Sequence, residues 1–175
     1  TVDNTGPTIS AVTQVVTPSN DTTPSYVFTT NEAGTITTNI AQGFSTSASA
    51  ANGNNTVTFN TLPEATYADK TVTVTDAAGN ASSLTLTTFV VDTTAPTISA
   101  VTQVVTPSND TTPSYVFTTN EAGTITTNIA QGFSTSASAA NGNNTVTFNT
   151  LPEATYADKT VTVTDAAGNA SSLTL

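Results

Sequence analysis

The sequence lacks cysteine, histidine, arginine, methionine and tryptophan altogether. Without cysteine there is no disulfide framework and no thiolate metal site. Without histidine or cysteine, an enzyme would lose the side chains that most often serve as general base or nucleophile. Only carboxylates remain for such chemistry, so we expect that the protein is not an enzyme.

Basic side chains are nearly absent as well. Lys70 and Lys159 stand against 12 acidic residues, which gives a formal net charge of −10. Nucleic-acid binding requires lysine and arginine to neutralise phosphates, and an anionic membrane surface would repel this chain. No run of residues approaches the ~20 apolar residues of a membrane-spanning helix. We therefore expect neither nucleic-acid binding nor direct membrane insertion.

The sequence consists of two tandem copies of one unit. Pro7–Leu86 recurs without a mismatch as Pro96–Leu175, at an offset of 89 residues. Small differences occur only in the leading segment of each copy, "TVDNTGPTI" at 1–9 and "VVDTTAPTI" at 90–98. Each copy is close to the ~100 residues of a small domain. We predict two domains, 1–91 and 92–175, and expect them to belong to a longer array of copied modules.

Alternation of apolar and polar residues predicts strands throughout, and helical periodicity is missing. In the first copy the expected strands are 8–16, 25–30, 35–40, 56–62, 70–76 and 82–92, with one short edge strand inside 41–55. About seven short strands separated by turn residues are typical of an immunoglobulin-like sandwich. We therefore predict an all-β protein of two tandem immunoglobulin-like β-sandwiches, arranged end to end.

Individual positions follow from this prediction. Val72 and Val74 should face the core, while the threonines that alternate with them face water. Tyr67 lies just before that strand, where a tyrosine corner would place its hydroxyl against upstream backbone. In the turn "NEAG" we expect Gly34 to supply backbone freedom.

Three motifs carry a resemblance to a known family. They are "VDTTAPTI" at the start of a domain, "NEAGTI" after the second strand and "VTVTDAAGN" near the end. In this order and in tandem, they resemble bacterial Ig-like (BIg) repeats of large surface adhesins, over both copies. The resemblance implies an extracellular location on the bacterial cell surface, and a role in cell adhesion and biofilms. It also implies a stalk of modules whose joints calcium ions stiffen.

The acidic residues of the turns form a candidate metal site. Strands of such a sandwich alternate in direction, so the leading segment meets the second-to-third and sixth-to-seventh strand turns at one pole. These segments carry Asp3, Glu32 and Asp76 in copy one, and Asp92, Glu121 and Asp165 in copy two. Ca²⁺ takes 6–8 oxygen ligands in irregular geometry and would relieve the repulsion between the carboxylates. The alternative is that the aspartates only form Asx turns and accept backbone N–H groups.

Two functions remain open at this point. In the first, the copies are structural extender modules of an adhesin, stiffened by calcium at the module junctions. We then expect a monomeric protein whose partners are neighbouring copies in cis, with any surface glycan or host ligand bound by other domains. In the second, the module itself binds a glycan, ice or a host surface through outward rows of threonine, although no aromatic platform for a sugar is evident.

Overall fold

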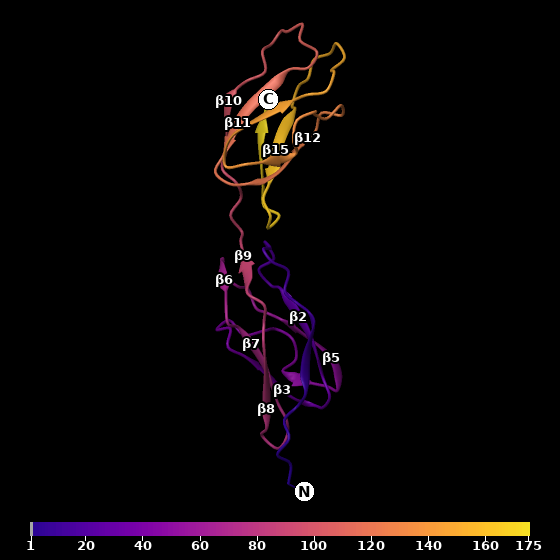
Figure 1. Ribbon diagram of the computed structural model, residues 1–175, viewed down its shortest axis with the longest axis vertical. Coiled ribbons are helices and arrows are strands. Elements are labelled where there is room, and N and C mark those ends of the chain that lie inside the picture. The colour runs from indigo at the N-terminus through magenta and orange to yellow at the C-terminus, as the bar shows by residue number, and fades with distance from the viewer. Residues whose placement is uncertain (1) are drawn as a thin grey trace. The chain divides into compact units, whose positions relative to one another are not determined.

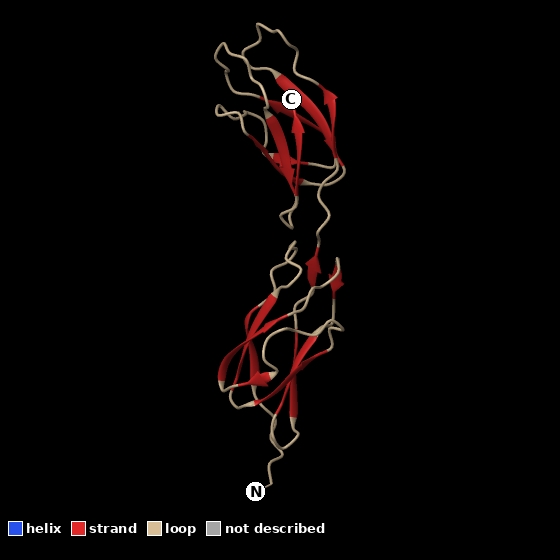
Figure 2. Ribbon diagram, turned by 180° about the vertical axis from the view of Figure 1, so that it is seen from behind, coloured by secondary structure: helices blue, strands red, loops and turns tan. Residues whose placement is uncertain are grey.

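The computed structural model describes residues 2–175, and these residues form strands and loops only (Figure 2). The chain divides into two compact units, Thr1–Thr93 and Thr94–Leu175. Within the described part of the chain, no helix is long and apolar enough to cross a bilayer. The prediction of an all-β protein is confirmed.

The first unit contains strands β1 to β9 (Figure 1). Their bounds are β1 Ile9–Thr13, β2 Ser25–Thr30, β3 Gly34–Thr38, β4 Ser49–Ala50, β5 Gly53–Thr58, β6 Ala65–Tyr67, β7 Thr71–Thr75, β8 Ala81–Thr85 and β9 Phe89–Val91. One sheet has the order β1-β2-β5, the second β4-β3-β7-β8, and β6 pairs with β9. All of these pairings are antiparallel.

The second unit repeats the two larger sheets. Its strands are β10 Ile98–Thr102, β11 Ser114–Thr119, β12 Gly123–Thr127, β13 Ser138–Ala139, β14 Gly142–Thr147, β15 Thr160–Thr164 and β16 Ala170–Thr174. The sheet orders are β10-β11-β14 and β13-β12-β15-β16. Each pairing has the register of its counterpart in the first unit.

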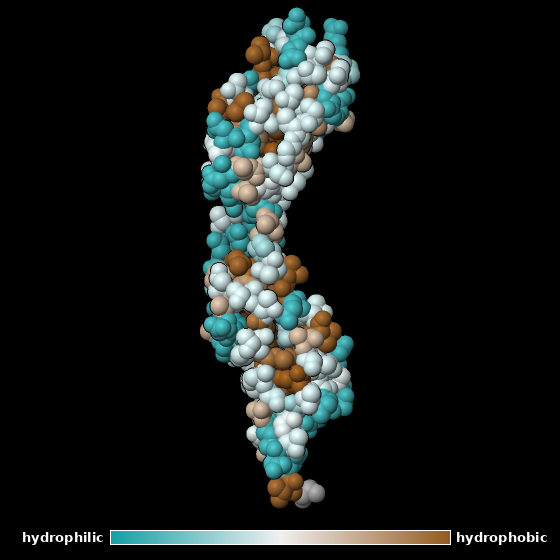
Figure 3. Space-filling view, in the orientation of Figure 1, coloured by the Kyte–Doolittle hydropathy of each residue, from teal (hydrophilic) through white to brown (hydrophobic). Residues whose placement is uncertain are grey.

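Each unit is a β-sandwich because both larger sheets contribute to one core. In the first unit, Tyr26 and Phe28 of β2 belong to the same hydrophobic cluster as Val72 and Val74 of β7. Val72 and Val74 are fully buried, as the alternation predicts. The intervening Thr73 hydroxyl lies 2.6 Å from the Ser83 hydroxyl of the neighbouring strand. The face drawn in Figure 3 is accordingly mostly hydrophilic or intermediate in hydropathy, with hydrophobic residues in small separate patches.

Several predicted strand boundaries are wrong. The first strand is shorter than 8–16, because β1 leaves β2 after an irregularity between Ala11 and Thr13. The predicted strand 82–92 is two strands, β8 and β9, separated by residues 86–88. The strand predicted at 56–62 begins earlier, because the polar residues Gly53–Asn55 pair with β2 despite their turn-like composition. Tertiary pairing overrides local preference in these places.

The tyrosine-corner prediction is confirmed in both units. The Tyr67 hydroxyl donates a hydrogen bond to the Pro63 carbonyl at 2.8 Å. Tyr156 makes the same bond to the Pro152 carbonyl, also at 2.8 Å. The segment around Tyr67, expected to be a turn, nevertheless contains strand β6. The corner bond therefore forms whether or not this segment is a strand.

Gly34 serves a purpose other than the predicted one. Its φ angle is not among the positive values of the glycines in the first unit, which occur at Gly43, Gly53 and Gly79. A Cβ at position 34 would instead lie 2.6 Å from the Thr75 carbonyl oxygen. Glycine thus lets the start of β3 pass unusually close to the end of β7. This close passage brings the turn before β3 next to the turn after β7.

Candidate metal site

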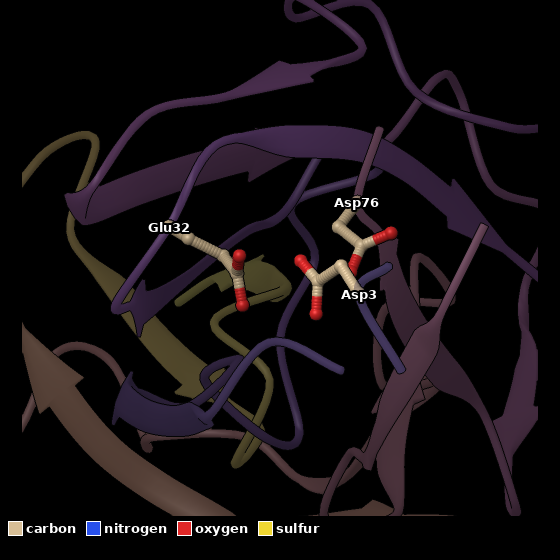
Figure 4. Close-up of side chains that lie close together, drawn as sticks. All are labelled: Asp3, Glu32 and Asp76. Carbon is tan, nitrogen blue, oxygen red and sulfur yellow. The ribbon is translucent and has the colours of Figure 1, made fainter. Parts of the chain in front are cut away.

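Three segments of the first unit bring carboxylates together. Asp3 lies in the leading segment before β1, Glu32 in the turn between β2 and β3, and Asp76 in the turn between β7 and β8. Each offers a carboxylate oxygen, and these oxygens lie within 4.8 Å of one another. Figure 4 shows the three side chains turned toward a common space. The structure therefore gathers the three acidic residues predicted for copy one.

The turn after β7 is organised around Asp76, whose side chain is only 9% exposed. Its Oδ1 atom accepts hydrogen bonds from the backbone N–H groups of Ala78 and Asn80, both at 2.8 Å. Its Oδ2 atom accepts one from the Asn80 side-chain amide at 2.8 Å. The Asn80 side chain and these backbone donors hold the pKa of Asp76 below its usual value, against the opposing effect of burial. Asp76 is therefore ionised at neutral pH.

Asparagine side chains attach the leading segment to both turns. Asn80 also donates its side-chain amide to the Asp3 carbonyl, at 3.3 Å. The Asn31 side-chain oxygen accepts the Thr8 N–H at 2.7 Å, and the Asn31 N–H donates to the Thr8 carbonyl at 3.2 Å. Asp3 itself accepts the Thr5 N–H at 3.1 Å. The leading segment is thus fixed by hydrogen bonds of the protein alone, which include the Asx-type bonds of the alternative interpretation.

The second unit repeats the pair of turns. Carboxylate oxygens of Glu121 and Asp165 lie within 4.8 Å of each other. Burial acts to raise the pKa of Asp165, but hydrogen bonds from Asn169 and its neighbours outweigh it and hold the pKa below the usual value. Asp92, the sequence counterpart of Asp3, is the penultimate residue of the first unit.

No basic side chain of the first unit balances its three carboxylates. Lys70, the unit's single lysine, precedes β7, whereas Asp76 follows it. A strand of this length separates them by about 20 Å, at ~3.3 Å per residue. At that distance, beyond the Debye length of ~8–10 Å, screening removes most of the attraction. The triad therefore has hydrogen-bond donors at Asp76 and Asp3 but no cationic side chain of the first unit beside it.

The donor set and its spacing fit a hard divalent cation. Two oxygens bound to one Ca²⁺ at ~2.3–2.6 Å each lie no more than about 5 Å apart. Oxygens within 4.8 Å of one another can therefore share one ion. Because Asp76 already accepts several donors, an ion would depend more on Asp3 and Glu32, which are more exposed. Both acidic groups could hold a metal ion on this chemistry.

Sequence reasoning missed the part played by Asn31 and Asn80. The signal was present, because an asparagine follows Asp76 by four residues across a hairpin turn. At that spacing its amide can reach back to the carboxylate.

Compared with family models and with curated proteins, the chain matches none.

Proposed function

We propose that the chain consists of structural extender modules from the stalk of a bacterial cell-surface adhesin, with no catalytic role. The observation that supports the proposal best is the convergence of Asp3, Glu32 and Asp76 from three separate segments. One of these is the segment by which the chain enters the domain. A cation there would tie the incoming chain to the body of the module, which is what a load-bearing repeat needs.

Calcium is the proposed ion. Extracellular modules bind Ca²⁺ with dissociation constants of about 10⁻⁴–10⁻³ M. At 100 times that constant, binding adds about 2.7 kcal/mol to stability. This is a sizeable share of the ~5–15 kcal/mol by which a domain is usually stable. Bound Ca²⁺ would therefore stabilise this Thr-rich domain to an extent that depends on the calcium concentration.

The proposal extends to the second copy through its sequence. Asp92 occupies the place of Asp3 in the segment that connects the two copies, and Glu121 and Asp165 repeat Glu32 and Asp76. The connection contains Thr-Thr-Ala-Pro and no Gly/Ser linker, and proline favours extended backbone there. Calcium bound by Asp92 would restrict this connection further, so that an array of copies becomes stiff. The partners are then neighbouring copies in cis.

Calorimetry with and without calcium tests the ion. Saturating Ca²⁺ should raise the melting temperature by more than about 10 °C over a chelator. The double variant Glu32→Gln, Glu121→Gln should lose most of this rise. The control Asp69→Asn, Asp158→Asn removes the same charge at exposed positions outside the triad and should keep it. Superimposable scans in calcium and chelator would overturn the calcium part of the proposal.

Solution scattering tests the stalk. The radius of gyration of the 175-residue chain should increase on addition of calcium, and the double glutamine variant should not respond. If calcium raised the melting temperature but left the radius of gyration unchanged, calcium binding would still be supported. The proposed stiffening of the stalk would be contradicted.

Nothing specific favours direct binding of a glycan or of ice by these modules. The outward hydroxyls of Thr73 and Ser83 bond to each other, as do those of Thr162 and Ser172. Among the described residues, the exposed large hydrophobic side chains are all valines, so a sugar would find no fully exposed ring. The threonine rows are explained by strand propensity on a wet sheet face.

A further inference from the structure

Asn52 and Asn141 are the only asparagines of the sequence that are followed by glycine. They occupy the same place in the two copies, directly before β5 and β14. In the first unit the chain crosses here between the two larger sheets, because β4 pairs with β3 whereas β5 pairs with β2. Both asparagines are exposed. An Asn-Gly pair therefore lies in water at the same crossing of each unit.

The glycine of each pair has open surroundings. Gly53 and Gly142 have φ angles of +101° and +99°, and a Cβ at either position would meet no atom within 4 Å. Gly53 also forms the last pair of the β2–β5 ladder, opposite Thr30. Without a side chain and without close neighbours, the main chain of this glycine leaves its nitrogen accessible to the side chain of the preceding asparagine.

An Asn-Gly pair in such a setting reacts with itself. When the Gly53 N–H loses its proton to hydroxide, the nitrogen attacks Cγ of Asn52. The new C–N bond closes a succinimide ring, and the side-chain nitrogen takes up a proton from water and leaves as ammonia. Water then opens the ring. Opening at Cγ gives aspartate, and opening at the main-chain carbonyl carbon gives isoaspartate, whose main chain runs through Cγ.

The side chain of Asn52 connects the crossing to the turn between β2 and β3. Its amide donates a hydrogen bond to the Asn31 carbonyl, as the Asn141 amide does to the Asn120 carbonyl. Asn31 in turn holds the leading segment, through the Thr8 N–H at 2.7 Å and the Thr8 carbonyl at 3.2 Å. The nitrogen that leaves as ammonia is thus the donor of the contact between the crossing and this turn.

Asn55 fixes the main chain on both sides of residue 52. Its Oδ1 atom accepts the Ala51 N–H at 2.9 Å, and its Nδ2 atom donates to the Ala51 and Gly53 carbonyls at 2.8 and 2.9 Å. Isoaspartate adds one methylene group to the main chain between these two residues. The bonds of Asn55 to both residues then no longer fit at the same time.

We propose that Asn52 and Asn141 are sites of spontaneous deamidation, and that the reaction releases the turn before β3, or before β12, from the crossing. A carboxylate replaces the amide donor, and the Asn31 carbonyl oxygen repels it. Each event adds one negative charge to a chain of net charge −10, beside the turn that carries Glu32. The extent of reaction therefore records the age of the folded protein. The inference depends neither on calcium nor on a stalk.

Incubation of the folded 175-residue chain tests the reaction. The ¹⁵N-labelled protein is held below its melting temperature at neutral and at alkaline pH. The asparagine side-chain NH₂ signals are followed, together with the aspartate and isoaspartate found in peptide maps. We expect the signals of Asn52 and Asn141 to disappear, faster at alkaline pH, while those of the other asparagines persist, because none of the others precedes glycine.

The single variants Asn52→Ser and Asn141→Ser assign the reaction to each copy, since the copies share their sequence here. Each variant should lose one reacting site and keep the other. The urea-unfolded chain shows that the chemistry is available. Conversion in the unfolded chain but not in the folded one, or equal conversion at asparagines that do not precede glycine, would overturn the proposal.

The variant Asn52→Asp tests the structural consequence, because it supplies the carboxylate directly. Exchange of the Asn31 amide proton should become about two- to tenfold faster, as expected when one hydrogen bond that orders the turn is lost. The matched control Asn54→Asp adds the same charge at an exposed position of β5 and should leave this exchange unchanged. Unchanged exchange in Asn52→Asp, or an equal effect of both variants, would contradict the release of the turn.

Discussion

Phe89 and Val91 are buried at one end of the core in the first unit, whereas residues 94–175 stop short of the corresponding positions in the second. The two larger sheets nevertheless keep the same strand order and register in both units. The comparison separates two parts of the fold. The sandwich needs only the sequence shared by both copies, while the β6 side of the core needs β9 to be closed.

The segment before Lys70 and Lys159 shows this most directly. Ala65–Tyr67 forms β6, but the identical Ala154–Tyr156 forms no strand. The two tyrosine corner bonds are both 2.8 Å, so the corner does not require the strand. Strand β6 therefore exists because β9 lies beside it, and in a polypeptide limited to residues 1–175 the second unit should be the less stable of the two.

Substitution of Phe89 should have the largest effect on the difference between the units. Phe89→Ala removes the ring that stacks on Tyr67 and Phe59, and should destabilise the first unit by about 3–5 kcal/mol. In urea, the unchanged chain should unfold in two steps, the second unit first. The variant should bring the two steps together.

Thr88→Ala is the matched control, because Thr88 is an exposed neighbour of Phe89 and its replacement should leave both steps in place. A single unfolding step in the unchanged chain would contradict the idea that β9 sets the difference in stability.

The alternation of apolar and polar residues was sufficient to predict the strands of the two larger sheets, but not the pairing of β6 with β9. Alternation placed Val72 and Val74 correctly because each strand carries its own hydrophobic face. It could not predict β6, since proline, glutamate and alanine in "PEATY" favour a turn and only pairing with a distant strand makes them extended. The contrasting state of the same residues in the second unit is the physical reason for that failure.

The candidate metal site was likewise predictable from the sequence only in part. Convergence of Asp3, Glu32 and Asp76 followed from strand direction, a property of the topology. The four-residue spacing indicated the bond from the Asn80 side chain to Asp76, whereas the bond from the same amide to the Asp3 carbonyl depends on where the leading segment lies and was not predictable. The asparagine bonds also show that protein donors contribute to the order of these acidic turns.

Substitution of Gly34 or Gly123 by alanine should lower stability less than Phe89→Ala does. The loss should be the same in both units. Gly34→Ala and Gly123→Ala would each place a Cβ 2.6 Å from a carbonyl oxygen, of Thr75 and Thr164. The strands must separate to admit it, which should cost about 1–3 kcal/mol in whichever unit carries the change.

Urea unfolding of the two single variants measures these losses, with Ala33→Ser and Ala122→Ser at exposed neighbouring positions as controls. A much larger loss in one unit would mean that β9 also supports the β3–β7 contact, contrary to the division drawn above.

The smallest effect is expected at a buried tyrosine common to both units. Tyr26 and Tyr115 are 0% exposed, and among the described residues their hydroxyls are the buried side-chain oxygens that have no hydrogen-bond partner. Tyr26→Phe and Tyr115→Phe remove an unsatisfied polar group, so stability at pH 7 should be unchanged or raised by about 1 kcal/mol.

The pH dependence of the free energy of unfolding is an independent test of Tyr26 and Tyr115. Burial raises the pKa of Tyr26 and of Tyr115 above 10.0, so the folded state retains protons that the unfolded state releases. Stability should therefore fall as pH rises above about 10, and the fall should be shallower in each phenylalanine variant. Unfolding curves at pH 7, 10 and 11 measure it. A steeper fall in the variants, or a marked loss at pH 7, would show that the hydroxyls are satisfied in solution.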